Sequence, residues 1–244
     1  MVGRLVTGMR HEFLSFETRQ DASRYATEFI ARALEKALED EPVASLMVSG
    51  GSTPGGVFDN LTEVDLAWDR VTVGLVDERW VGPESDASNE RLVRERLLTG
   101  KSGAAGFLPM KTQARTAGQA VQQRHLAYLP HCSPVDVILL GMGEDGHTAS
   151  WFPNSAGLEA AMSSDTDQAV AVIDATGCPV AGDNTDRMTL TGAAVGKAKA
   201  AVLLIFGEAK KSVFEASLEA SSKDRPIRHA VDTLGPRLTV IWAP

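Results

Sequence analysis

The sequence predicts an α/β protein with a mostly parallel sheet and helices on both faces. Four short apolar runs lead to this prediction, at residues 44–48, 71–76, 135–140 and 201–206. Each run is apolar at consecutive positions, as expected for strands that are covered on both faces. Each is followed by a polar segment and then by a helical pattern. Strands and helices that alternate in this way are typical of parallel sheets.

The helices are predicted from spacing and from their starts. Over residues 21–38, apolar side chains recur at intervals of three and four, which is the pattern of an amphipathic helix. Asp21 is the expected N-cap of this helix, because a carboxylate there can accept the free N–H groups of the first turn. Pro54 suits the first turn of a second helix, where its missing N–H costs nothing.

Length and composition indicate one folded unit. The chain has 244 residues, of which 43% are hydrophobic and 23% charged, so a sizeable core can form. The sequence shows no internal repeat, and the Gly, Ser and Ala stretch at residues 99–106 is expected to be a connecting loop rather than a linker between domains. We therefore predict a single domain over residues 1–244.

The charge and the cysteines exclude several classes of function. A formal net charge of -8 gives no general attraction for nucleic acid, so any anionic ligand must be held by a few placed cations. Cys132 and Cys178 form neither a CxxC pair nor a zinc pattern, so neither a metal site nor a disulfide is expected. No apolar run reaches the roughly 18 residues of a membrane span, which predicts a soluble, cytoplasmic protein.

The polar segments after the four strands hold the candidate functional residues. In open parallel sheets, ligands bind outside the carboxyl ends of the strands, where these segments are expected to meet. Gly50, Gly51, Ser52 and Thr53 follow the first strand, and their N–H groups suit a phosphate. A plain tight turn is the alternative. Pro54 replaces the last glycine of a Gly-x-Ser-x-Gly motif, which argues against a nucleophilic Ser52.

Two further segments supply cations. Asp77, Glu78 and Arg79 follow the second strand in what is expected to be a loop. There Arg79 suits a phosphate or carboxylate, and Asp77 suits the orientation of a base or a substrate hydroxyl. An Asp–Arg ion pair that only closes the loop is the alternative. After the fourth strand, Lys210 and Lys211 lie near the start of a helix, where a lysine opposes the helix dipole and indicates a nearby anion. A solvated lysine is the alternative here.

The segment after the third strand holds the main catalytic candidate. Residues 141–147 read Gly-Met-Gly-Glu-Asp-Gly-His and contain the Gly-x-Gly-x-x-Gly pattern of dinucleotide-binding proteins. Glu144 and Asp145 would place two carboxylates where a pyrophosphate should lie, which disfavours that ligand. The glycines instead permit a tight turn that presents His147 beside Asp145, a pair that can activate water. A structural histidine bonded to the backbone is the alternative.

In order along the chain, these segments resemble the 6-phosphogluconolactonases. The segments that carry the resemblance are residues 48–54, 76–79, 88–90, 136–150, 187–191 and 207–210. A match in several ordered parts is far more specific than any one motif. The glucosamine-6-phosphate deaminases are close relatives and share the fold.

The resemblance implies a Rossmann-like α/β fold and a reaction. The reaction is hydrolysis of 6-phosphoglucono-δ-lactone to 6-phosphogluconate in the oxidative pentose phosphate pathway, without a metal or other cofactor. The resemblance also implies that His147 is the general base for water and that Asp77 and Asp145 flank it. It implies phosphate contacts from Ser52, Thr53, Arg79 and Lys210. The implied partner is therefore a small sugar-phosphate lactone, not nucleic acid or a membrane. The sequence does not set the oligomeric state, and a monomer is compatible with it.

Two alternative functions remain open. A glucosamine-6-phosphate deaminase would carry a glutamate before the proline of its corresponding segment, and here Phe152 precedes Pro153. A sugar-phosphate sensor should carry a helix-turn-helix, but only about 20 residues precede the first helix and they hold no basic helical pair. Residues 151–154 read Trp-Phe-Pro-Asn where the lactonases usually show Leu-Phe-Pro-Gly, a departure that we expect to affect packing more than chemistry.

Overall fold

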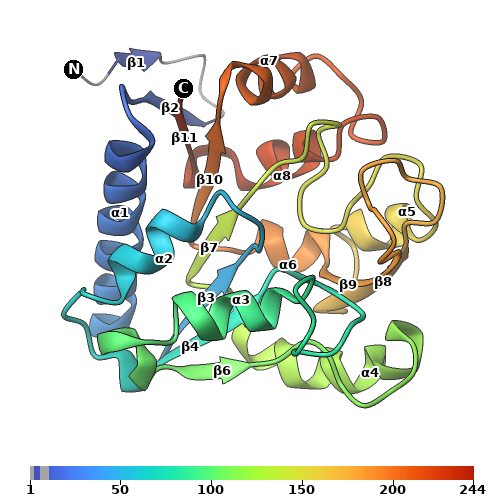
Figure 1. Ribbon diagram of the computed structural model, residues 1–244, viewed down its shortest axis with the longest axis horizontal. Helices are drawn as coiled ribbons and strands as arrows, with labels where there is room; N and C mark the ends of the chain where they lie inside the picture. The colour runs from blue at the N-terminus through green and yellow to red at the C-terminus, as the bar shows by residue number, and fades with distance from the viewer. Residues whose placement is uncertain (1–2, 6–10) are drawn as a thin grey trace.

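The computed structural model describes residues 3–5 and 11–244 of the chain. Its centre is an eight-stranded sheet with the strand order β1-β2-β11-β10-β7-β3-β4-β6 (Figure 1). β2 and all strands after it in this order run parallel, and β1 pairs antiparallel with β2 at one edge. The strands are β1 (Gly3–Leu5), β2 (Glu12–Ser15), β3 (Ala44–Val48), β4 (Val71–Leu75), β6 (Gly106–Leu108), β7 (Val137–Leu140), β10 (Ala200–Phe206) and β11 (Leu238–Ala243).

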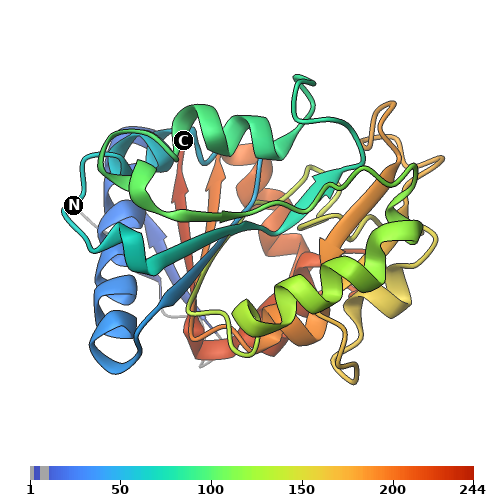
Figure 2. The ribbon, with the colours of Figure 1, turned by 90° about the horizontal axis from the view of Figure 1, so that it is seen from below.

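Helices cover both faces of this sheet. On one side lie α1, α2 and α3, and on the other lie α4, α6 and α8 (Figure 2). The predicted fold class is therefore confirmed. The α-helices are α1 (Arg19–Asp40), α2 (Gly55–Leu61), α3 (Asn89–Arg96), α4 (Ala117–Tyr128), α5 (Leu158–Met162), α6 (Gly192–Gly196), α7 (Glu208–Ser217) and α8 (Ile227–Leu234). The 3-10 helices are η1 (Trp68–Arg70), η2 (Gly100–Ala104), η3 (Leu129–His131) and η4 (Gly235–Arg237).

The four predicted strands are confirmed as β3, β4, β7 and β10. They lie side by side in the order β10-β7-β3-β4, and all side chains of β3 and β7 are buried. Because strands at this depth have no solvent face, their sequences are apolar at consecutive positions rather than alternating. The buried side chains of the sheet and its covering helices form one contiguous hydrophobic core.

The start of α1 differs from the prediction. The helix begins at Arg19 and its N-cap is Thr18, not Asp21. The Thr18 hydroxyl oxygen accepts the N–H of Asp21 at 3.1 Å. Asp21 thus lies in the first turn, where its carboxylate favours the positive end of the helix dipole. Threonine and aspartate are both good N-caps, so local composition could not decide between them.

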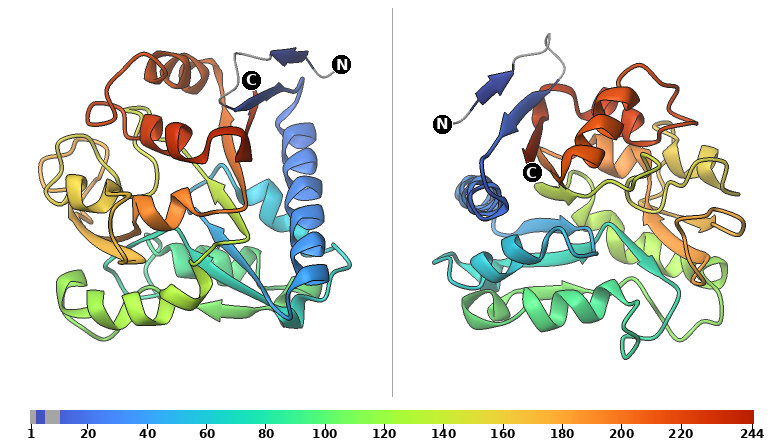
Figure 3. Two further views of the ribbon diagram at one scale, coloured as in Figure 1. Left: turned by 180° about the vertical axis from the view of Figure 1, so that it is seen from behind. Right: turned by 45° about the horizontal axis from the view of Figure 1, so that its top comes forward.

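A second sheet was not predicted. It has the order β5-β9-β8, is antiparallel, and consists of β5 (Asp77–Arg79), β8 (Val170–Asp174) and β9 (Asp186–Leu190). β8 and β9 lie on the opposite side of the molecule from α1 (Figure 3). The expectation of a loop at 77–79 is therefore wrong, because pairing with the distant β9 turns this segment into a strand. The expected loop at 99–106 is also wrong in part, since it contains η2 and the start of β6.

Three findings bear on the predicted exclusions. Cys132 and Cys178 are free thiols, as predicted. Across the part of the chain that the structure describes, no helix is long and apolar enough to cross a membrane. Within the same residues, no group of three or more His, Cys, Asp or Glu side chains is placed to hold a metal ion.

Candidate active site

A cavity of about 270 Å³ lies at the carboxyl ends of β3, β4, β7 and β10. Between β3 and β7 the strand order reverses, because β4 and β6 follow on one side and β10 and β11 on the other. Loops that leave adjacent strands in opposite directions open a crevice at such a point, and ligands of α/β proteins bind there. The cavity therefore lies where the fold class expects a ligand.

The structure brings the predicted site residues together around this cavity. The lining includes Gly50, Gly51, Ser52, Thr53, Asp77, Arg79, His147 and Lys210. Asp145 is not part of the lining but lies behind the ring of His147. Residues from four separate segments of the chain thus meet at one edge of the sheet.

His147 is held on both sides of its ring. Its Nδ1 lies 2.6 Å from Asp145 Oδ1, which also accepts the backbone N–H of His147 at 3.1 Å. Phe152 packs on the imidazole with 4.4 Å between ring centroids. A side chain on Gly143 would collide with the imidazole, so this glycine makes the room that the ring occupies. With Nδ1 engaged by Asp145, Nε2 is the nitrogen left for a ligand.

The carboxylate of Asp145 is suited to hold the ring of His147. Burial acts to raise the pKa of Asp145, but the hydrogen bond and the charge of His147 outweigh it and lower the pKa below the ordinary value. The group is therefore ionised at neutral pH. An ionised carboxylate on Nδ1 fixes the tautomer and stabilises the ring when Nε2 takes up a proton.

β5 divides its three side chains between the cavity and the protein interior. Asp77 and Arg79 line the cavity and Glu78 does not, because side chains alternate along a strand. The carboxylate of Asp77 accepts the Ser150 hydroxyl at 2.5 Å and the Asn89 amide at 3.3 Å. Asp77 is thereby fixed in orientation at the cavity wall.

Glu78 connects β5 to the start of α3. Its carboxylate accepts the backbone N–H groups of Arg79, Asn89 and Glu90 at 2.8, 2.9 and 2.8 Å, and the Ser88 hydroxyl at 3.1 Å. Burial raises the pKa of Glu78 to about 7, although the three backbone bonds oppose this. Through these bonds Glu78 sets the position of Asn89, which contacts Asp77.

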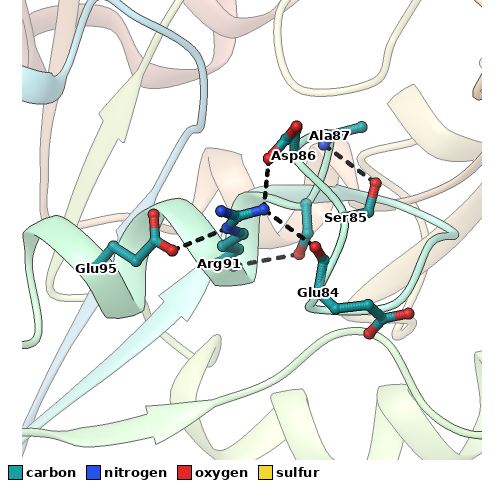
Figure 4. A network of polar contacts seen from close by, with 7 residues as sticks. Glu84, Ser85, Asp86, Ala87, Arg91 and Glu95 are labelled. Atoms are coloured by element: carbon teal, nitrogen blue, oxygen red, sulfur yellow. Dashed lines mark hydrogen bonds and ion pairs between the residues drawn. The ribbon is translucent and has the colours of Figure 1, made fainter.

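Arg79 is anchored to a loop that α3 holds in place. Its Nη1 donates to the carbonyl of Ala87 at 2.7 Å. In turn, Arg91 of α3 donates to the Glu84 carbonyl at 3.1 Å and pairs with Asp86 in the same loop (Figure 4). The Nε of Arg79 is buried and has no hydrogen-bond partner among the described residues. Arg79 itself lines the cavity, so its guanidinium can contact a ligand there.

The first loop presents unused backbone donors. The N–H groups of Gly50, Gly51, Ser52 and Thr53 donate to no acceptor within residues 3–5 and 11–244. Gly51 has a φ of 87°, which L side chains rarely adopt. A side chain on Gly50 would collide with Asn89. Both glycines are therefore required for a conformation in which successive N–H groups can meet an anion.

Lys210 and Lys211 have different surroundings. Lys210 lines the cavity, and its Nζ donates to the Met142 carbonyl at 2.5 Å. Burial lowers the pKa of Lys210, while Glu144 and Asp145 oppose this. Lys211 instead lies over the ring of Trp242, 4.4 Å from the centroid. Of the two lysines, only Lys210 can meet a ligand in the cavity.

Sequence reasoning assigned no role to Asn89 and Arg187, two polar residues of the lining. Asn89 is buried and donates to the Asp77 carbonyl at 2.8 Å. Arg187 of β9 is 3% exposed, and burial lowers the pKa of Arg187 against the charge of Asp77. Both lie in segments of the family resemblance, which was the only signal for them. Nothing in the local pattern indicates that either side chain faces a cavity.

Comparison with known proteins gives one family over nearly the whole chain. Residues 17–241 match the family described as glucosamine-6-phosphate isomerases/6-phosphogluconolactonase. The 6-phosphogluconolactonase of Xylella fastidiosa (strain Temecula1) is 41% identical over 218 residues, or 87% of this chain and 90% of that protein. That of Rhizobium meliloti is 38% identical over 232 residues, or 94% and 97%. A crystal structure of a 6-phosphogluconolactonase from Shewanella baltica has a TM-score of 0.89 and 36% identity, covering 95% of this chain and 97% of that one. The chain therefore belongs to the glucosamine-6-phosphate isomerase/6-phosphogluconolactonase family.

Proposed function

We propose that this protein hydrolyses 6-phosphoglucono-δ-lactone to 6-phosphogluconate, with His147 as the general base. One observation carries the proposal. The ring of His147, held by Asp145 at 2.6 Å, shares a cavity with three cations and a row of unused backbone donors. A base and an anion site in one cavity suit a phosphorylated ester. The names of the three relatives support the same substrate.

The phosphate is proposed to bind at the first loop. The free N–H groups of residues 50–53 and the hydroxyls of Ser52 and Thr53 offer hydrogen-bond donors. Lys210 and Arg79, which also line the cavity, supply positive charge. The phosphate takes no part in the bond changes. Its binding energy orients the lactone carbon toward the base.

The chemical step needs a base, a water molecule and a donor for the leaving oxygen. Nε2 of His147 accepts a proton from water as the water oxygen attacks the lactone carbonyl carbon. The imidazolium then returns that proton to the ring oxygen as the carbon–oxygen bond of the lactone breaks. Asp145 stabilises the imidazolium between the two events. Asp77, held by Ser150 and Asn89, is proposed to orient the water or a substrate hydroxyl.

The same proposal covers the cellular role. The product would be that of the lactonase step of the oxidative pentose phosphate pathway, formed by a single domain without a cofactor. The sequence-based expectation of a cytoplasmic protein stays a prediction.

Glucosamine-6-phosphate deamination is the competing function within the family. That reaction would require a glutamate before Pro153, and this position holds Phe152. The Phe152 ring packs on His147, so the place next to the imidazole is apolar. The carboxylate on His147 comes from Asp145 instead, on the Nδ1 side. The geometry therefore favours hydrolysis over ring opening with deamination.

The test is acid release from freshly generated 6-phosphogluconolactone, run beside an ammonia assay with glucosamine 6-phosphate. Wild-type protein is expected to accelerate the first and not the second. His147→Ala should lower kcat by about 10³-fold with little change in KM, as for loss of a general base. His131→Ala is the matched control, because His131 lies in η3 and does not line the cavity. A His147→Ala variant as fast as wild type would refute the assigned base.

A further inference from the structure

We infer that Arg187 binds the carbonyl oxygen of the lactone as it becomes an oxyanion, and then the carboxylate of the product. The inference rests on the proposed function, because the second negative charge arises only when the lactone is hydrolysed. It assigns Arg187 a different ligand group from Lys210 and the loop at residues 50–53, which are proposed to hold the phosphate.

The first argument is a pair of like charges. Arg79 of β5 and Arg187 of β9 lie directly opposite each other in the antiparallel ladder, and both line the cavity. Like charges at such a position repel and destabilise a sheet. Neither arginine forms an ion pair with a carboxylate in the part of the chain that the structure describes. A separate anionic group at each guanidinium, the phosphate at Arg79 and the oxyanion or carboxylate at Arg187, would offset the repulsion.

The second argument is that Arg187 is fixed with one nitrogen unused. Its Nε donates to the Asn184 carbonyl at 2.5 Å, and its Nη2 donates to the Ala181 carbonyl at 2.8 Å. No acceptor among the described residues takes a hydrogen bond from Nη1. A buried guanidinium with a free donor satisfies it with a ligand or water. Since the other two nitrogens face carbonyl groups of its own segment, Nη1 is the donor left for the cavity.

The third argument places this donor near the base. The guanidinium of Arg187 lies over the Phe152 ring, 5.3 Å from the centroid. The same ring packs on the imidazole of His147 at 4.4 Å. Base and guanidinium therefore share one aromatic wall. On this proposal, a lactone whose carbonyl carbon faces His147 presents its carbonyl oxygen to Arg187.

During the reaction, negative charge develops on the oxygen that this donor is proposed to bind. As water attacks, the carbonyl π electrons move to oxygen, and the oxyanion accepts a hydrogen bond from Nη1. When the intermediate collapses, the carbon–oxygen bond of the ring breaks and the ring oxygen takes the proton from His147. The acid formed loses its proton to solvent, and the resulting carboxylate pairs with Arg187. A donor aimed at developing charge lowers the barrier more than it strengthens substrate binding.

The test compares two ligands that differ only at this group. 6-Phosphogluconate carries both a phosphate and a carboxylate, whereas glucitol 6-phosphate carries the phosphate alone. Calorimetric titration of Arg187→Met should show binding of 6-phosphogluconate weakened by about tenfold or more, with glucitol 6-phosphate within about twofold of wild type. Arg79→Met, the matched control across the ladder, should weaken both ligands alike. In turnover, Arg187→Met should lower kcat by about 10²–10³-fold with a much smaller change in KM.

Each outcome decides the inference. Equal weakening of both ligands by Arg187→Met would make Arg187 a phosphate residue, and no weakening of either would make its role structural. Both results overturn the proposal. If Arg187→Met does not fold, as judged by thermal melting, Arg187→Lys should shift the ratio of affinities in the same direction by a smaller factor, because lysine keeps the charge but loses the planar donors. Absence of lactone turnover by wild-type protein would refute the proposed function instead, while the ratio of affinities still reports on Arg187.

Discussion

The two walls of the cavity are built in different ways. One, the loop wall, consists of residues 49–54 and 141–149, which leave β3 and β7 as tight turns rich in glycine. The other, the strand wall, is the β5–β9 ladder with Asp77, Arg79 and Arg187. The loop wall obtains its shape from backbone conformation within a few residues. The strand wall obtains its shape from pairing between distant segments and from buried hydrogen bonds. The same chemistry is thus sensitive to different kinds of substitution on its two sides.

Conformational strain is found on the loop wall. Ala149, which lines the cavity, has a φ of 52°. Asn154, which follows the loop wall and does not line the cavity, has a φ of 61°. Left-handed backbone costs roughly 1 kcal/mol or more for an alanine and less for an asparagine. The strand wall shows no residue with left-handed backbone among the described positions. Its free-energy cost comes instead from the burial of Glu78 and Arg187. Strain on one side and buried charge on the other are the two ways in which this site is held.

The largest effect is expected from Gly143→Ala on the loop wall. The added methyl group would collide with the imidazole of His147 and approach Asp145, so the base must move. We expect kcat to fall by about 10³-fold, within the range for loss of a general base, while KM changes little. Steady-state lactone hydrolysis checks this. Gly118→Ala, in α4 with no atom closer than 3.9 Å, is the control and should keep wild-type kcat. Unchanged kcat in Gly143→Ala would show that the position of the His147 ring does not depend on the space that Gly143 leaves beside it.

A smaller effect is expected from Glu78→Gln behind the strand wall. The pKa of Glu78 is raised from 4.5 to about 7, so between these pH values the folded chain keeps a proton that the unfolded chain releases. The free energy of unfolding therefore falls as pH rises through this window. The wild-type value minus that of Glu78→Gln should decrease by about 3 kcal/mol from pH 4.5 to above pH 7.

Urea unfolding of both proteins at several pH values measures this difference. Glu95→Gln on the exposed face of α3 is the control, and its difference from wild type should not change with pH in this way. A difference between wild type and Glu78→Gln that stays flat across the window would mean that the buried carboxyl titrates like an exposed one. The strand wall would then carry no cost of buried charge at Glu78.

The smallest effect is expected at Asn154. Because its φ is positive, Asn154→Gly should stabilise the fold by about 0.5 kcal/mol and Asn154→Ala should destabilise it by about 1 kcal/mol. Thermal melting of the two variants measures the opposite signs, with kcat unchanged because Asn154 does not line the cavity. Equal melting temperatures would remove conformational strain as a feature of this segment. Stabilisation by Asn154→Gly would also explain why the resembling family usually has glycine at this position.

Local patterns were enough to predict the centre of the fold and the loop wall. The four apolar runs are confirmed as β3, β4, β7 and β10, since burial on both faces leaves a trace in every residue of a strand. The order of elements then predicts where their loops meet. His147 stood out as a base beside a carboxylate, and the structure places Asp145 against its ring. Its catalytic role stays a proposal.

The strand wall was beyond the reach of such patterns. β5 has only three residues and was expected to be a loop, and its partner β9 lies more than 100 positions later in the chain. A short strand becomes a strand through hydrogen bonds to its partner, so its own sequence carries little signal. For the same reason, the sequence could not predict that Arg79 and Arg187 lie opposite each other in the β5–β9 ladder.

The sequence by itself determined the α/β class, the four central strands and the loops at their carboxyl ends, because burial and turn formation impose local patterns on residue type. Only the tertiary structure decided that Arg187 lies opposite Arg79, that Asn89 and Ser150 hold Asp77, and that one Phe152 ring contacts both His147 and Arg187. These contacts join segments far apart in the chain. They depend on strand register and on packing, which no local pattern specifies.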